Sequence, residues 1–198
     1  MQKGSSTILN VTQEAHHRVF VGLGWDPRGQ AGLIGNLTEK LSGKALHHDL
    51  DLSCCLYDAN NQLIDIVSAE TAHAADRTGK IYHSGDSIEG EGPGDDEQIS
   101  VELKDIDPAI RNIIFAATIK SGHSFGDIHE PEIRLADGYS NREFLVSALH
   151  ADAGQDKSGY VFVRLYIEGD AWMVQNIGEF FDAGAEKSLA DFLKTFIE

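Results

Sequence analysis

Apolar and polar residues alternate along most of the chain, which is the pattern of strands that have one buried face. The clearest case is segment 49–57, in which Leu50, Leu52, Cys54 and Leu56 would share one face. The residues between them would point to the other side, so this pattern predicts a half-buried strand. The same criteria, together with turn residues, predict further strands at residues 18–25, 62–67, 99–103, 113–119, 132–135, 144–149, 160–168 and 171–177.

Helical periodicity is confined to the C-terminal part of the sequence. Leu189, Phe192, Leu193 and Phe196 recur at helical spacing, and Ser188 precedes them with an acidic residue three positions later. Many short strands, glycine-rich turns and one terminal helix predict an all-β protein. We expect a β-sandwich of two antiparallel sheets with a short C-terminal helix. With no internal repeat and no clear linker, a single domain over residues 1–198 is expected.

Composition narrows the classes of function. The chain has 198 residues, 41% of them hydrophobic, and a formal net charge of -16 at pH 7. This charge argues against nucleic acid and anionic membranes as partners, and favours cations or basic partners. No apolar run approaches a membrane span, so no membrane insertion is expected. The only cysteines, Cys54 and Cys55, would point to opposite faces of a strand without forming a disulfide, and a cytoplasmic location is expected.

One loop concentrates the negative charge. Residues 85–97 contain six carboxylates and four glycines but no Lys, Arg or His. Carboxylates and turned-in carbonyls form the all-oxygen environment that calcium prefers, so the loop is a candidate calcium site. A solvated acidic turn or a disordered linker would have the same composition. The loop does not match an EF-hand, because Ile88 and Glu91 occupy its third and sixth positions.

A second acidic feature lies on the predicted strand 49–57. Asp49 and Asp51 are two residues apart, so their carboxylates would leave the same face about 6.6 Å apart along the strand. Taken alone, this pair indicates ordinary polar alternation on an outer face. Taken with the acidic loop and Asp26, it favours a metal site.

Three segments in this order resemble the TerD family of tellurium-resistance and stress proteins. They are residues 22–26 (Gly-Leu-Gly-Trp-Asp), 49–51 (Asp-Leu-Asp) and 85–97, and the likeness extends over about residues 15–180. The resemblance implies a cytoplasmic β-sandwich that binds about two calcium ions at one edge. It also implies a role in resistance to tellurite and other stresses, with other stress-response proteins as partners and no enzymatic activity.

The resemblance also implies a set of metal ligands. Ser87 and Glu89 depart from the usual family residues, yet Ser87 still offers a hydroxyl and Glu89 a further carboxylate; Pro93 keeps its carbonyl. The implied calcium ligands are Asp26, Asp49, Asp51, Asp86, Ser87, Glu89, Glu91, Asp95, Asp96 and Glu97.

Two other functions use the same acidic residues. A divalent-metal-dependent hydrolase could employ paired carboxylates, although no nucleophile or electrophilic Lys or Arg stands beside them in the sequence. An interaction module could use the acidic edge to bind a basic partner without metal. The nine histidines have no metal-ligand spacing and are expected at the surface.

Overall fold

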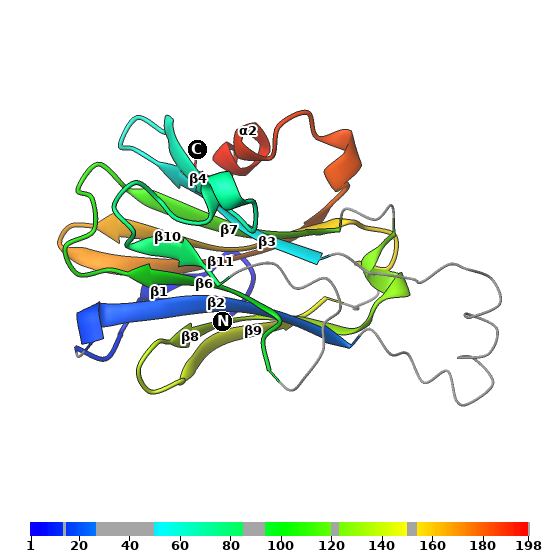
Figure 1. Ribbon diagram of the computed structural model, residues 1–198, viewed down its shortest axis with the longest axis horizontal. Coiled ribbons are helices and arrows are strands. Elements are labelled where there is room, and N and C mark those ends of the chain that lie inside the picture. The colour runs from blue at the N-terminus through cyan, green and yellow to red at the C-terminus, as the bar shows by residue number, and fades with distance from the viewer. Residues whose placement is uncertain (14, 27–49, 85–93, 120–122, 150–153, 198) are drawn as a thin grey trace.

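The strands form two antiparallel sheets that pack face to face (Figure 1). The computed structural model describes residues 1–13, 15–26, 50–84, 94–119, 123–149 and 154–197. In the first sheet the order is β1 (Ser6–Ile8), β11 (Ala171–Phe181), β10 (Gly159–Glu168), β7 (Asn112–Ile119), β3 (Leu50–Tyr57) and β4 (Leu63–Val67). In the second sheet the order is β5 (Ile81–His83), β6 (Glu97–Glu102), β2 (Arg18–Asp26), β8 (His129–Asp137) and β9 (Glu143–Ala148).

Helix is sparse in the described residues. One α-helix, α2 (Leu189–Lys194), follows the last strand, and Ser188 caps it by accepting a hydrogen bond from the Asp191 amide. Three 3₁₀ turns, at Ala15–His17, Thr71–His73 and Phe125–Asp127, lie between strands, and a fourth, at Ala183–Ala185, lies between β11 and α2. The architecture confirms the predicted β-sandwich with a short C-terminal helix.

The main core lies between the two sheets. Leu50, Leu52, Cys54 and Leu56 of β3 all contribute to it and are fully buried, as their alternation predicts. From the second sheet, alternate residues of β2 such as Leu23 face the same core. Because alternate residues of both sheets point inward, the core joins the two layers along the length of the strands.

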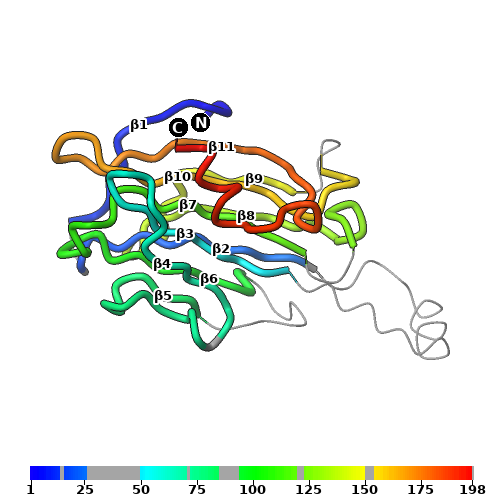
Figure 2. Tube along the Cα trace, turned by 90° about the horizontal axis from the view of Figure 1, so that it is seen from above, coloured from blue at the N-terminus to red at the C-terminus, as the bar shows by residue number. Residues whose placement is uncertain are grey.

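The outer face of the first sheet is also covered. Helix α2 runs across it (Figure 2), and Cys55, Tyr57 and Ile114 are buried beneath Leu193. The Tyr57 hydroxyl donates a hydrogen bond of 2.6 Å to the Ala190 carbonyl oxygen on the helix. The prediction of a half-buried strand at 49–57 was therefore wrong. Alternation within one strand does not reveal that a helix from a distant part of the sequence covers the second face.

The observed strands agree with the predicted ones, except that two short strands, β1 and β5, were not predicted. β1 and β5 have three residues each and lie at sheet edges, and three residues are too few for a period of two to stand out in the sequence. β6 begins at Glu97, two residues before the predicted start, because Glu97 pairs with Leu23 of β2. Among the described residues, no helix is both long enough and apolar enough to cross a membrane.

Candidate functional site

Gly22 and Gly24 of β2 provide the space in which residues 94–96 lie. A Cβ on Gly22 would stand 2.2 Å from Asp95 Cγ, and one on Gly24 would stand 2.9 Å from the Gly94 carbonyl oxygen. Neither distance is possible for a real side chain, so only glycine lets the acidic segment approach the strand this closely. The Gly-Leu-Gly motif therefore makes room for the acidic segment.

Asp95 lies over β2 and forms an ion pair with Arg134 of β8. Arg134 Nε donates to Asp95 Oδ1 and Nη2 donates to Asp95 Oδ2, both at 2.8 Å. The guanidinium also stacks over the Phe20 ring at 5.1 Å and lies 3.3 Å from Glu143. The hydrogen bonds that Arg134 donates to Asp95 raise the pKa of Arg134, as expected for a guanidinium held by a carboxylate.

Asp96 connects the acidic segment to the end of β2. Its amide donates to the Leu23 carbonyl at 2.8 Å, and its Oδ2 accepts a 2.9 Å hydrogen bond from the Trp25 amide. The carboxylate is partly exposed, whereas Trp25 is buried. Asp96 thus lies at the boundary between the core and the surface, where an oxygen ligand can reach a cation from solvent.

Glu97 is fully buried and links the two sheets. Its Oε2 accepts a 2.7 Å hydrogen bond from the Leu52 amide of β3, and His83 Nε2 lies 3.3 Å from the same oxygen. Burial raises the pKa of Glu97, and the nearby Asp51 carboxylate raises it further, while hydrogen bonds from His83 and Leu52 oppose the increase. A cation close to Glu97 and Asp51 would offset their repulsion.

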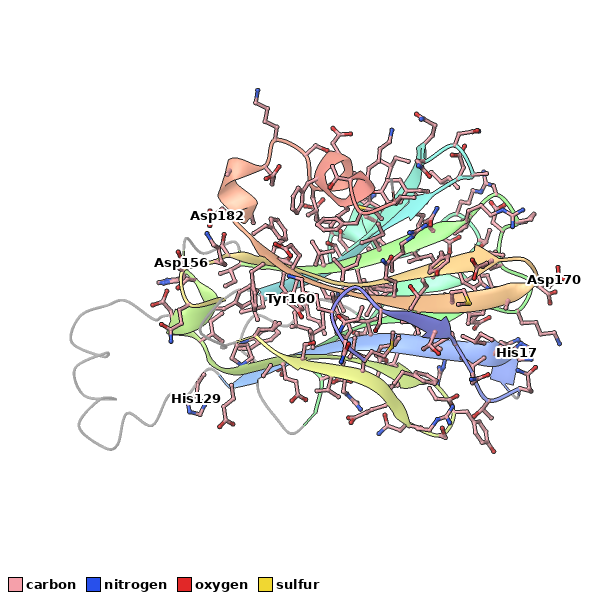
Figure 3. All side chains as sticks on the ribbon, turned by 180° about the vertical axis from the view of Figure 1, so that it is seen from behind. His17, His129, Asp156, Tyr160, Asp170 and Asp182 are labelled. Atoms are coloured by element: carbon pink, nitrogen blue, oxygen red, sulfur yellow. The ribbon has the colours of Figure 1, made fainter. Side chains whose placement is uncertain are left out.

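The acidic segment, residues 94–97, lies at one end of the sandwich, where β2 ends and β3 begins (Figure 1). The β2 residue Asp26 pairs with His129 of β8, and Figure 3 shows His129 at this end, opposite His17 and Asp170. A surface hollow of about 540 Å³ opens beside the segment. Asp95, Trp25 and Arg134 line it, together with three glutamates, Glu130, Glu132 and Glu143.

The structure describes only part of the predicted ligand set. Asp95 and Asp96 directly precede β6, Glu97 begins it, and Asp51 of β3 lies close enough to Glu97 to raise its pKa. The Asp26 side chain and all of Asp49, Asp86, Ser87, Glu89 and Glu91 lie outside the described residues. Within the described part, no three His, Cys, Asp or Glu side chains are placed to hold a metal ion by themselves. The ligand set as a whole therefore stays a prediction.

Two residues of this region were not identified from the sequence. Arg134 gave no signal, because its partner Asp95 is 39 positions away and contact depends on the order of the strands. His83 was expected at the surface with the other histidines but is only 7% exposed. That expectation was wrong because β5 pairs with β6 and brings His83 against Glu97.

The cysteines agree with the sequence analysis. Cys54 and Cys55 are free thiols, both fully buried, one on each face of β3. Burial raises the pKa of Cys55 to about 12. Such a thiol carries almost no thiolate near neutral pH, so it is a poor nucleophile or metal ligand.

Fold and site together define a β-sandwich protein with an acidic segment folded against a glycine-bearing strand. A family model of the TerD domain matches residues 1–196, and the chain belongs to this family. It is 29% identical to a tellurium resistance protein TerD of Alcaligenes sp., over 97% of this chain and 95% of the relative. It is 28% identical to a stress response protein of Bacillus subtilis (strain 168), with 90% of each chain covered.

Solved structures show the same fold. The crystal structure of a homologue of telluride resistance protein (TerD) from Streptomyces coelicolor A3(2) superposes with a TM-score of 0.67. The alignment covers 84% of this chain and 90% of that one at 24% sequence identity. The chain is thus a TerD-domain β-sandwich whose relatives are named for tellurium resistance and stress response.

Proposed function

We propose that this protein binds calcium at the end of the sandwich where residues 94–97 cross β2, and that it acts as a non-enzymatic scaffold in a stress response. The observation that carries the proposal is the glycine cradle. Gly22 and Gly24 leave room for Asp95 and the Gly94 carbonyl, which brings several oxygen atoms to one edge. An all-oxygen donor set of this kind suits calcium, which takes 6–8 oxygen ligands.

The described residues fit this role in part. Asp51, Asp96 and Glu97 would provide carboxylate oxygens, and the predicted ligands at 26, 49 and 86–91 adjoin them in the sequence. Asp95 has both oxygens bound to Arg134, so calcium would share this carboxylate with a guanidinium. When bound, calcium would offset the repulsion between these carboxylates and so favour the folded arrangement of the edge.

A scaffold needs a surface that a partner can recognise. The hollow beside the site has glutamates at 130, 132 and 143, and among its described lining residues only Arg134 is basic. This charge suits a lysine or arginine side chain of a partner, and it is consistent with the net charge of -16. Calcium would then fix the edge beside the surface that the partner binds.

Titration calorimetry with calcium tests the proposal. Asp96→Asn keeps the shape of the side chain but removes its charge, and it should weaken calcium binding at least about tenfold, or 1.4 kcal/mol. Asp156→Asn is the matched control, because Asp156 is 82% exposed in a separate loop. Calcium should also raise the melting temperature by several degrees and magnesium by much less. Equal melts in calcium and in chelator would contradict the proposal.

The alternative is a divalent-metal-dependent hydrolase that uses the same carboxylates. The observation in its favour is the hollow of about 540 Å³ beside Asp95, which has room for a small substrate. A screen with phosphate esters, glycosides and peptides in calcium, magnesium or manganese separates the two functions. We expect no turnover. Metal-dependent turnover that disappears in Asp96→Asn would favour the hydrolase.

A further inference from the structure

A second hollow, of about 380 Å³, lies on the outer face of the first sheet, beside the C-terminal segment. Its lining comes from the turn between β3 and β4, the start of β7, the second half of β10 and Ile197. Strand β10 leads from it into the turn that holds Asp170, which Figure 3 shows at the end opposite His129. The hollow is therefore distinct from the acidic edge.

The charge of this hollow is opposite to that of the protein. Arg111 and Arg164 line it, and no Asp or Glu is among the lining residues that the structure describes. Neither guanidinium has a carboxylate partner within the part of the chain that the structure describes. In a chain with 32 acidic residues and 16 Lys and Arg, two arginines in one hollow, neither paired with a carboxylate of the described residues, indicate a site for an external anion.

Arg164 is held in a fixed orientation. Its Nε donates a 2.7 Å hydrogen bond to Asn112 Oδ1, and its guanidinium stacks over the Tyr166 ring at 4.5 Å. Asn112 is itself only 5% exposed, and Nη1 donates a longer hydrogen bond of 3.5 Å to Gln175 Oε1, so Nη2 is the nitrogen without an acceptor among the described residues. Burial lowers the pKa of Arg164, the nearby Tyr166 opposes this only in part, and a bound anion would stabilise the charged guanidinium.

Arg111 is fixed at its backbone and exposed at its side chain. Its amide donates to the Tyr57 carbonyl at 2.8 Å, and its carbonyl accepts from the Ile167 amide at 3.3 Å. These bonds hold the main chain between β3 and β10 and present the guanidinium at the rim of the hollow. The site thus combines one oriented guanidinium with one on an exposed side chain.

We propose that this hollow binds a small oxyanion of the phosphate monoester class. Two guanidinium groups match the charge of a phosphate group, which is about -1.5 to -2 near pH 7. The planar guanidinium fork binds two oxygens of one phosphate, and the Asn112 amide nitrogen supplies further donors. Tyr166 and Ile197 provide apolar walls for the organic part of a monoester.

The test is an NMR titration that follows the arginine Nε–H signals of protein freed of divalent cations, at constant ionic strength. Inorganic phosphate and phenyl phosphate should each give saturable shifts of the Arg164 signal, and acetate should bind at least about tenfold more weakly. Arg164→Gln should weaken phosphate binding about tenfold or more. Arg142→Gln is the matched control, because Arg142 also stacks over a ring, Phe144, but on the second sheet.

Each outcome decides the proposal. A response without saturation, an equal affinity for acetate, or unchanged binding in Arg164→Gln would overturn it. If Arg164→Gln does not fold, Arg111→Gln replaces it, since the Arg111 side chain is exposed and makes no described contact on which folding depends. The titration contains no calcium, so its result is independent of the proposal for the acidic edge.

Discussion

Arg134 on β8 binds both carboxylate oxygens of Asp95, and this ion pair ties the acidic segment to the second sheet. The two side chains are 17% and 13% exposed, so the pair is largely shielded from water. Salt bridges at the surface contribute little, whereas loss of one partner from a buried pair leaves a costly lone charge. The position of Asp95 therefore depends on a residue of another strand.

Arg134→Gln should lower the free energy of unfolding by about 1–3 kcal/mol, a value between those of exposed and fully buried pairs. Urea unfolding without calcium measures the change. Lys3→Gln is the control, since Lys3 and its partner Glu179 are 62% and 44% exposed, and its effect should stay within about 0.5 kcal/mol. The double variant with Asp95→Asn should lose less than the sum of the single changes. Strict additivity would show that the pair is not coupled.

Gly22→Ala should destabilise the protein by about 1–3 kcal/mol, because the new methyl group must displace the Asp95 carboxylate from its contact with Arg134. Gly184→Ala is the control, since a Cβ there meets nothing within 4 Å. Thermal melts of both variants provide the comparison. If Gly22→Ala has the same melting temperature as the wild type, the acidic segment does not lie on β2 in solution.

The strands could be predicted from the sequence because their signal is local. The hairpin of β10 and β11 is an example, since alternation on both sides of Gly169-Asp170 defines it without any other part of the chain. The order of strands in the sheets depends on long-range pairing, which alternation does not encode. For that reason the placement of β2 between β6 and β8 was not predicted.

The candidate site could likewise be predicted only where its signal was local. The acidic residues 95–97 stood out by composition, and the structure brings them to β2. Arg134 and His83, the partners of these acidic residues, could not be identified, because nothing in the sequence distinguishes them from an arginine or histidine at the surface. Gly22 and Gly24 were part of the family motif, but their function as a cradle depends on the segment that packs on them.

Asp137 should produce a measurable pH dependence of stability. Burial alone would raise the pKa of this carboxyl, but hydrogen bonds from Ser140, Thr12 and Tyr139 hold it well below its usual range. A depressed pKa stabilises the fold above the unfolded value of about 3.9, and this contribution is lost as the pH falls through the folded value.

At pH 7, the free energy of unfolding of Asp137→Asn should therefore be about 1–3 kcal/mol lower than that of the wild type. The difference should shrink as the pH falls below about 4. Urea unfolding of both proteins from pH 7 to pH 3 measures it. Asp170→Asn, a change of an exposed residue in a turn, should leave stability unchanged at every pH. A constant gap between Asp137→Asn and wild type would mean that the carboxyl has an ordinary pKa in the fold.

Trp25 should report calcium binding by its fluorescence. The indole is buried and lines the hollow beside the acidic edge, while its backbone amide donates to Asp96 Oδ2. A calcium ion that binds Asp96 would change this contact and the electric field at the ring. The other tryptophan, Trp172, lies on β11 in the other sheet, so it should be insensitive to the ion.

Trp172→Phe should therefore keep a calcium-dependent change of emission, and Trp25→Phe should lose it while binding calcium with unchanged affinity by calorimetry. The fluorescence midpoint of Trp172→Phe should agree with the calorimetric Kd, and adding Asp96→Asn should move it at least about tenfold to higher calcium. A response that persists in Trp25→Phe would place the ion away from the end of β2. That result would contradict the site proposed for calcium, even if the protein binds the ion.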